Sequence, residues 1–422
     1  MTRSQDGAFV DDPPPLEIRA RNRELAAVDP GALVVAFFLT QLHQTAENEE
    51  RSRTGFLDWV TVRRAKALFE GHNQPRVPGA LGYYDLLDIE PHHAQAQLAK
   101  ASGVGAFCYY AHWFQGRRLL EGPLELVGAH PELAMPYAIC WENEPWSGQR
   151  NHSEHKVQVA PRRAPDGDAQ FIDDMAHHLA DPRYLRVLGR PLLLLSRPAL
   201  LEEPIRTTDA LRERAHRLGI GDLFLAMVQS FGHWEPISYG FDAAVEFPPH
   251  GLEVAASEAR PRRAPPAGRA RGAVSSYLDA IRVALSRPVP QFTWFRGLIP
   301  DWDDTPRRGP LGSVYRGASP TAFRGWLDAL IECTYLFRPP GERLIFVNAW
   351  NGWAEGAYLE PDTVHGGAFL QAIRAALDDA RGLADETAKL GLRAPGDSRL
   401  LEIARARWTG YPALSATSDA DR

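Results

Sequence analysis

Short, continuous apolar runs recur along the chain, and segments with the hydrophobic spacing of a helix separate most of them. Eight runs have the length and composition of buried parallel strands: 33–39, 104–110, 136–141, 191–197, 223–229, 241–247, 289–295 and 344–347. Helices are predicted at 90–102, 168–180, 207–219, 273–286, 320–336 and 366–382. Such alternation of strands and helices predicts a parallel sheet.

Eight strand–helix units of this size favour an α/β fold, the (β/α)8 TIM-type barrel, with long loops on its C-terminal face. The alternative is an open, doubly wound sheet, which normally carries a Gly-rich phosphate-binding turn after an early strand, and the sequence has none. We therefore predict an N-terminal extension over 1–30, the barrel over 31–381, and a helical or disordered tail over 382–422.

The stretch around the last predicted strand, RLIFVNAWNGWAEGAYLEP at 343–361, is the richest in polar and aromatic side chains. Aromatic faces stack on the apolar face of a pyranose, amides bond its hydroxyls, and a carboxyl group moves protons. This combination predicts a sugar site. The alternative is a strand end with a tight turn and a few satisfied polar residues.

Polar and aromatic residues also follow the other predicted strands, where a (β/α)8 barrel carries its catalytic groups. So many convergent strand ends predict a polar, aromatic-lined cleft. The predicted substrate-binding residues are His43, Tyr110, His112, Trp113, Trp141, Asn143, Trp294, Trp350, Asn351 and Trp353. The alternative for the tryptophans is a place in the core, and the alternative for Glu246 is a cap on the turn that follows it.

Composition narrows the function classes. A net charge of -6 and a pI near 6.2 argue against a nucleic-acid partner, which needs a basic face. The three cysteines show no disulfide or zinc pattern, and no two of the strand-end histidines have helical zinc spacing, so we expect no metal and no cofactor. The N-terminus lacks a signal-peptide core and no run reaches the roughly 18 apolar residues of a spanning helix, which predicts a cytoplasmic protein. The oligomeric state stays open.

Several strings resemble the WbsX-type, glycoside hydrolase family 99-like domain: GAFCYYAHWFQGRRLLEGPL, CWENEPW, AVEFPPHG, DDTPRRG and NAWNGWAEGAYLEPD. The resemblance covers roughly residues 33–380, with the motifs in the family's order. It implies a (β/α)8 barrel that acts on an oligosaccharide or polysaccharide, often in bacterial surface-polysaccharide assembly. The related endo-α-mannosidases are retaining, metal-independent enzymes whose two carboxylates lie in an Asn-Glu-Trp-x-Glu-Gly motif after the last strand.

The sequence departs from that motif at one of the two carboxylates. The family's acid/base maps onto Glu355, whereas its other catalytic glutamate is replaced by Gly352. Glycoside hydrolysis ordinarily needs two carboxyl groups. A second one is expected from another strand end, and the candidates are Glu144, Glu142 and Glu246.

Three functions stay open at this point. The first is a retaining endo-glycosidase-like enzyme with Glu355 as acid/base and a recruited second carboxylate. The second is a sugar transferase in surface-polysaccharide biosynthesis, where an activated donor reduces the need for the missing base. The third is a catalytically degenerate barrel that binds glycan without turnover, which Gly352 would also explain.

Overall fold

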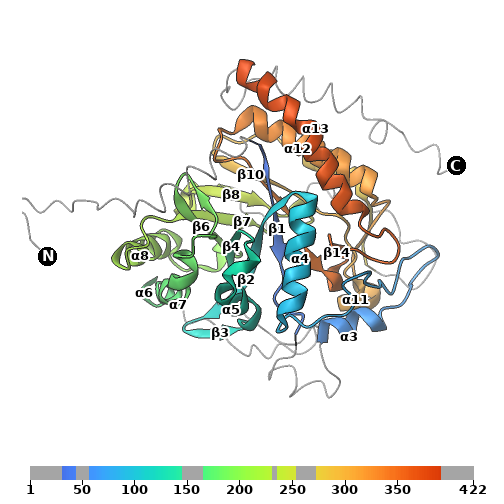
Figure 1. The fold of residues 1–422 in the computed structure, drawn as a ribbon, viewed down its shortest axis with the longest axis horizontal. Helices are drawn as coiled ribbons and strands as arrows, with labels where there is room; N and C mark the ends of the chain where they lie inside the picture. The colour runs from blue at the N-terminus through green and yellow to red at the C-terminus, as the bar shows by residue number, and fades with distance from the viewer. Residues whose placement is uncertain (1–30, 44–56, 145–164, 231–234, 253–271, 391–422) are drawn as a thin grey trace, which may run out of the picture. The chain divides into compact units, whose positions relative to one another are not determined.

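Each of the eight predicted apolar runs forms a strand of one closed parallel sheet (Figure 1). The computed structural model describes residues 31–43, 57–144, 165–230, 235–252 and 272–390. Its barrel strands are β1 (Leu33–Phe38), β2 (Val104–Phe114), β4 (Tyr137–Glu142), β6 (Arg190–Leu195), β7 (Phe224–Gln229), β8 (Ala243–Glu246), β10 (Thr293–Leu298) and β12 (Leu344–Val347). Because β1 pairs in parallel with both β12 and β2, the sheet closes on itself, and the predicted (β/α)8 barrel is confirmed.

Helices separate most of the barrel strands and cover the outside of the sheet (Figure 1). They are α3 (Leu57–Arg64), α4 (Ile89–Ser102), α5 (Gly122–Ala129), α6 (Pro165–Asp168), α7 (Gln170–Leu179), α8 (Pro204–Arg217), α10 (Tyr277–Ser286), α11 (Thr305–Arg308), α12 (Pro320–Phe337) and α13 (Ala368–Leu390). None of the helices within the described ranges is long and apolar enough to span a membrane.

Short elements decorate the loops. The small strands are β3 (Arg117–Leu119), β5 (Arg186–Val187), β9 (Val274–Ser276), β11 (Val314–Arg316), β13 (Asn351–Gly352) and β14 (Ala357–Tyr358). The 3-10 turns are η1 (Pro131–Leu133), η2 (Pro198–Leu200), η3 (Ile237–Tyr239), η4 (Gly309–Leu311) and η5 (Trp353–Glu355). Of these, β13, η5 and β14 build the loop after the last barrel strand, which carries the predicted catalytic residue.

Local sequence explains where the helices start and stop. Ser319 precedes α12 and accepts a hydrogen bond from the Ala322 amide at 3.2 Å, and Pro320 suits the first helical position. Ser276 caps α10 in the same way, through the Asp279 amide. Helix α4 ends at Gly103, whose φ of 84° is a left-handed conformation that a glycine adopts without penalty.

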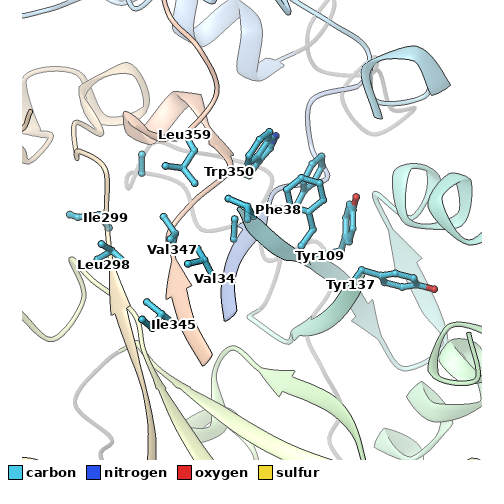
Figure 2. Packing of buried hydrophobic residues seen from close by; sticks show 14 of the residues in the cluster. Val34, Phe38, Tyr109, Tyr137, Leu298, Ile299, Ile345, Val347, Trp350 and Leu359 are labelled. Carbon is cyan, nitrogen blue, oxygen red and sulfur yellow. The ribbon is translucent and has the colours of Figure 1, made fainter. Parts of the chain in front are cut away.

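The two-residue period of the strands divides the core into two layers. Along β1, Val35 and Phe37 belong to the cluster that fills the barrel interior, whereas Val34 and Phe38 belong to the cluster between the barrel and its helices. Figure 2 shows part of this outer layer, with Phe38 and Tyr109 on neighbouring strands; their ring centroids are 4.5 Å apart. The same alternation decides which side chains at each strand end face the mouth of the barrel.

Several bounds differ from the prediction. Strand β2 continues to Phe114, because β3 folds back on it as an antiparallel strand and pairs with its last residues. Strand β10 lies a few residues later than predicted, and α13 extends to Leu390. The predicted extension 1–30 and the end of the predicted tail lie outside the described residues, so the domain boundaries remain predictions.

Glu246, predicted as a catalytic candidate, ends β8 with its side chain in the outer layer. It is 1% exposed, and its carboxylate accepts from Arg287 at 2.8 Å, from Arg296 at 2.8 Å and from the Gly297 amide at 3.1 Å. Its three donors come from α10's C-terminus and β10, away from the barrel mouth. Glu246 is therefore a structural ion-pair partner in this structure.

We predict that Glu246→Ala lowers the free energy of unfolding by about 3–5 kcal/mol, because it leaves the buried Arg296 without its counter-charge. Urea unfolding followed by circular dichroism measures this change. The control is Glu203→Gln at an exposed pair with Arg206, where we expect less than about 0.5 kcal/mol. Equal stability of the Glu246→Ala variant and the wild type would contradict the assignment.

Candidate active site

Tyr110, His112 and Glu142 lie at the mouth of the barrel. In β2 and β4 the interior is lined by Cys108 and Cys140, and the next residues of the same parity are Tyr110, His112 and Glu142. His112 is the register partner of Glu142 on the neighbouring strand. All three side chains are half-buried, so they reach the mouth from inside the sheet.

Among the predicted strand-end acids, Glu142 has electrostatics that suit proton transfer. Burial raises the pKa of Glu142 to about 7, against the opposing effect of the hydrogen bonds from the Glu144 amide at 2.9 Å and from Ser196. A carboxyl group that titrates near neutral pH is able to donate a proton under physiological conditions. The sequence drew attention to Glu142 only as one of several strand-end acids.

Glu355 lies in η5, in the loop after β12. Its half-buried carboxylate forms an ion pair with Arg307 of α11, and its backbone carbonyl accepts from the Asp303 amide at 2.7 Å. The pair with Arg307 favours the ionised form of Glu355. Glu355 therefore lies beside a positive charge.

Tyr110 lies within electrostatic reach of groups at two strand ends. Burial raises the pKa of the Tyr110 hydroxyl; the charge of Glu142 acts in the same direction and that of Arg307 in the opposite direction. Arg307 is also the ion-pair partner of Glu355. Tyr110 therefore lies near Glu142 and near the arginine that pairs with Glu355.

A buried polar cluster positions the Glu355 loop. Asp303 accepts from His72 at 2.8 Å and from Gln74 at 2.7 Å, while Arg76 pairs with Asp301 at 2.8 Å. A Cβ at Gly356 would lie 2.9 Å from the Asp303 amide, so the loop backbone packs directly on this cluster. The first strand-to-helix loop and the loop after β10 together hold the catalytic loop in place.

Two histidines near the strand ends have lowered pKa values. Burial lowers the pKa of His112 to about 4, and burial together with Arg197 and Arg308 lowers the pKa of His250 to about 4. His250 also stacks on Phe247 at 5.6 Å and meets the edge of Trp302 at 5.9 Å. Neutral imidazoles both donate and accept hydrogen bonds, which suits recognition of sugar hydroxyls.

Gly352 has room for no side chain. Its φ is -75°, which any residue can adopt, but a Cβ there would lie 2.5 Å from the Ala357 carbonyl oxygen and 3.3 Å from Glu355 Oε2. The β13–β14 hairpin brings these groups together. A negative φ alone therefore does not let a glutamate replace this glycine, because the opposing backbone occupies the space.

Three of the predicted sugar-stacking tryptophans lie in the layer between the barrel and its helices. Trp113 and Trp141 pack against Phe171 of α7, and the Trp113 indole donates to Asp174 at 2.6 Å. Trp294 is 5% exposed and donates to Gln229 at 2.8 Å. These three indoles are therefore core side chains, which was the alternative to sugar binding, and they do not lie at the barrel mouth.

The two tryptophans of the 343–361 stretch are buried as well. Trp350 is fully buried and packs on Phe107, with the ring centroids 4.9 Å apart. Trp353 stacks on Tyr358 at 3.8 Å and donates to Glu360 at 2.6 Å. Both side chains therefore support the loop that carries Glu355.

Glu360 is the centre of that support. Besides the Trp353 indole, its carboxylate accepts from the Tyr84 hydroxyl at 2.8 Å and from the Gln95 amide at 2.7 Å. Burial raises the pKa of Glu360 to about 7 even though these donors oppose the shift. A buried carboxylate with this many donors fixes the loop against α4 and the loop that precedes it.

The predicted asparagines bind backbone groups. Asn351 exchanges two hydrogen bonds with the Leu39 backbone, at 2.8 and 3.0 Å, and Asn143 exchanges two with the Arg197 backbone, at 2.9 and 3.0 Å. Each amide joins two strand ends at the rim. His43, just after β1, is 3% exposed, and Glu144 is largely exposed and pairs with Arg197 at 3.0 Å.

Comparison with known proteins places the chain in a family. The sequence model described as "Glycosyltransferase WbsX" matches residues 34–373. The chain belongs to the WbsX glycosyltransferase family. WxcX, an uncharacterized protein of Xanthomonas campestris pv. campestris, is 41% identical over 355 residues in each of two strains. The match covers 84% of this chain and 51% of WxcX, so this WbsX-family chain spans about half the length of those relatives.

Solved structures support the fold of this WbsX-family protein. The GH99 endo-alpha-mannosidase from Bacteroides thetaiotaomicron, in complex with BIS-TRIS-propane, superposes with a TM-score of 0.54 at 13% identity, covering 86% of this chain and 99% of that chain. A second structure of that enzyme gives 0.50 at 12% identity, covering 85% and 99%. At this identity the likeness shows a shared barrel fold.

We predict that Gly352→Ala lowers the free energy of unfolding by about 1–3 kcal/mol, because the new methyl group meets the Ala357 carbonyl and forces the hairpin apart. Gly367→Ala is the matched control, since a Cβ there has nothing within 4 Å. Thermal and urea unfolding of both variants measure the difference. A Gly352→Ala variant as stable as the control would show that the hairpin yields without cost.

Proposed function

We propose that the protein is a carbohydrate-active enzyme that acts on glycosidic bonds of a polysaccharide, with Glu142 and Glu355 as its pair of catalytic carboxylates. Membership of the WbsX glycosyltransferase family and the glycoside hydrolase type of barrel support this substrate class. The observation that carries the assignment is the place of Tyr110, which lies within electrostatic reach of Glu142 and of Arg307, the ion-pair partner of Glu355.

Glu142 acts as the general acid in this proposal. A raised pKa keeps a large fraction of the side chain protonated near neutral pH, which is what protonation of a leaving glycosidic oxygen requires. His112 lies beside it on β2 and bonds the sugar hydroxyls. The Glu144 amide and Ser196 hold the carboxyl group at the end of β4.

Glu355 acts as the ionised partner. Its ion pair with Arg307 keeps the negative charge that a general base, or a group stabilising an oxocarbenium-like transition state, needs. We had expected Glu355 to be the acid/base on the family's pattern. The arginine at its side is the reason that we exchange the roles and give the acid to Glu142.

Glu142 takes the place of the glutamate that the family motif has at position 352. Hydrolysis needs two carboxyl groups, and the hairpin leaves no space for one at Gly352. In this proposal Glu142, at the end of β4, supplies the second carboxyl group. Glu144 and Glu246 do not take this role, since Glu144 points to solvent with Arg197 and Glu246 is sealed in the outer layer.

Sugar transfer is the second candidate reaction. The description of the family as a glycosyltransferase favours it, and so does Gly352 in place of the second catalytic glutamate, because an activated donor leaves without strong base assistance. The same Glu142 would then assist the leaving group or the acceptor hydroxyl. Assembly of a bacterial surface polysaccharide is the setting in which either reaction would serve.

We predict that Glu142→Gln and Glu355→Gln each lower kcat by about 10²–10⁴, because each removes a proton-transfer or charge-stabilising group from the transition state. Turnover is measured on α-linked mannan-type oligosaccharides and with nucleotide-sugar donors plus an acceptor glycan. Glu203→Gln, on the outer side of the barrel just before α8, is the control and retains full activity. Retained turnover in Glu142→Gln together with its loss in Glu144→Gln would contradict the pairing, and glycan binding without turnover by the wild type would favour the degenerate barrel.

The pH dependence gives a separate prediction. A general acid works only while protonated, so kcat/KM of the wild type falls as the pH rises through about 7, the pKa of Glu142. The side-chain amide of the Glu142→Gln variant does not titrate, so the residual activity of this variant keeps no such limb. A limb near pH 7 that survives in the variant would assign the proton to another group.

A further inference from the structure

Three metal-binding side chains converge between α5 and α7, outside the barrel. Glu125 lies on α5, and His177 and His178 are consecutive residues at the end of α7. His177 Nε2 is 3.2 Å from Glu125 Oε2, and His178 Nε2 is 3.5 Å from Glu125 Oε1. One ligand atom from each residue lies within 4.8 Å of the other two, so the three side chains could hold one metal ion.

The cluster lies away from the candidate active site. His178 Nδ1 is 3.1 Å from the hydroxyl of Tyr137, and Tyr137 is the first residue of β4. Glu142, the candidate acid, is the last residue of the same strand. The cluster therefore belongs to the foot of the barrel and takes no part in the proposed reaction.

The other ring nitrogen of His178 is held by a hydrogen-bond network. Its Nδ1 lies 3.1 Å from the Tyr137 hydroxyl, which is also 3.1 Å from Asp181 Oδ2. Arg183 pairs with Asp181 at 2.6 Å. This network leaves Nε2 of His178 on the side of Glu125.

One buried nitrogen of the cluster lacks a hydrogen-bond partner. His178 is fully buried. Within the described part of the chain its Nε2 has no hydrogen-bond partner, and the Glu125 carboxylate lies 3.5 Å away. A cation bound by both residues would satisfy this nitrogen, as in metal sites where the second ring nitrogen bonds an oxygen.

We propose that Glu125, His177 and His178 bind one divalent transition-metal ion of the zinc class. Imidazole nitrogens with one carboxylate are zinc ligands, and a water molecule completes the four-coordinate shell. Arg118 pairs with Glu125 Oε1, which leaves Oε2, on the side of His177, for the metal. The ion would join α5 to α7 and hold them on the foot of β4. Consecutive histidines lack helical zinc spacing, so the sequence pattern did not predict this site.

Zinc binding by the full chain, prepared without a histidine tag and stripped with a chelator, tests the proposal. We expect calorimetric titration with Zn²⁺ to give one ion per chain, and Co²⁺ to give the visible absorption of a tetrahedral site. His177→Ala, at a half-exposed position that folding tolerates, and Glu125→Gln should each weaken Zn²⁺ binding at least about 10-fold. His216→Ala, an exposed histidine on α8, is the matched control and binds as the wild type does.

Thermal unfolding provides a second readout. Zn²⁺ should raise the unfolding midpoint of the wild type and of His216→Ala, since a ligand that binds the folded state stabilises it, but not that of His177→Ala. The proposal is overturned if the wild type binds no Zn²⁺ at about 100 µM. It is equally overturned if His177→Ala and Glu125→Gln bind Zn²⁺ as tightly as the control.

Discussion

The closed parallel sheet is the constraint on which the rest of the structure depends. Successive side chains of a strand point alternately into the barrel and out toward the helices. At each strand end, therefore, only every second residue can point into the mouth of the barrel. Glu142 and Tyr110 have the inward parity, whereas Trp141, Glu246 and Trp294 have the outward parity. A difference of one residue along a strand thus separates a candidate catalytic acid from a structural one.

Much of the fold could be predicted from the sequence because burial on both faces leaves a strong signal. The apolar run Leu344–Val347 is a strand with the predicted bounds, and the seven other runs form the rest of the same barrel sheet. The side-chain direction at the strand ends was harder to predict. It depends on the register and on how far each strand continues, as with β2, whose extension to Phe114 is due to pairing with β3.

The 343–361 stretch shows why residue composition alone assigns the wrong roles to site residues. Tryptophans and asparagines beside carboxylates suit a sugar, but Trp350, Trp353 and Asn351 are used to build the loop that presents Glu355. Arg307 forms an ion pair with Glu355 but lies in a different loop. Their contact therefore depends on tertiary structure. The sequence located the loop, while the charge on Glu355 and the raised pKa of Glu142 follow only from the packing around them.

The central claim is that Glu142 and Glu355 lie on opposite sides of one glycosidic bond. A crystal structure with an uncleaved oligosaccharide bound tests it most directly. We expect a glycosidic oxygen within hydrogen-bond distance of the Glu142 carboxyl group. Glu355 should lie on the other side of the same sugar ring, and His112 should bond the hydroxyls of that sugar. An oligosaccharide whose glycosidic oxygens all lie beyond the reach of Glu142 would contradict it.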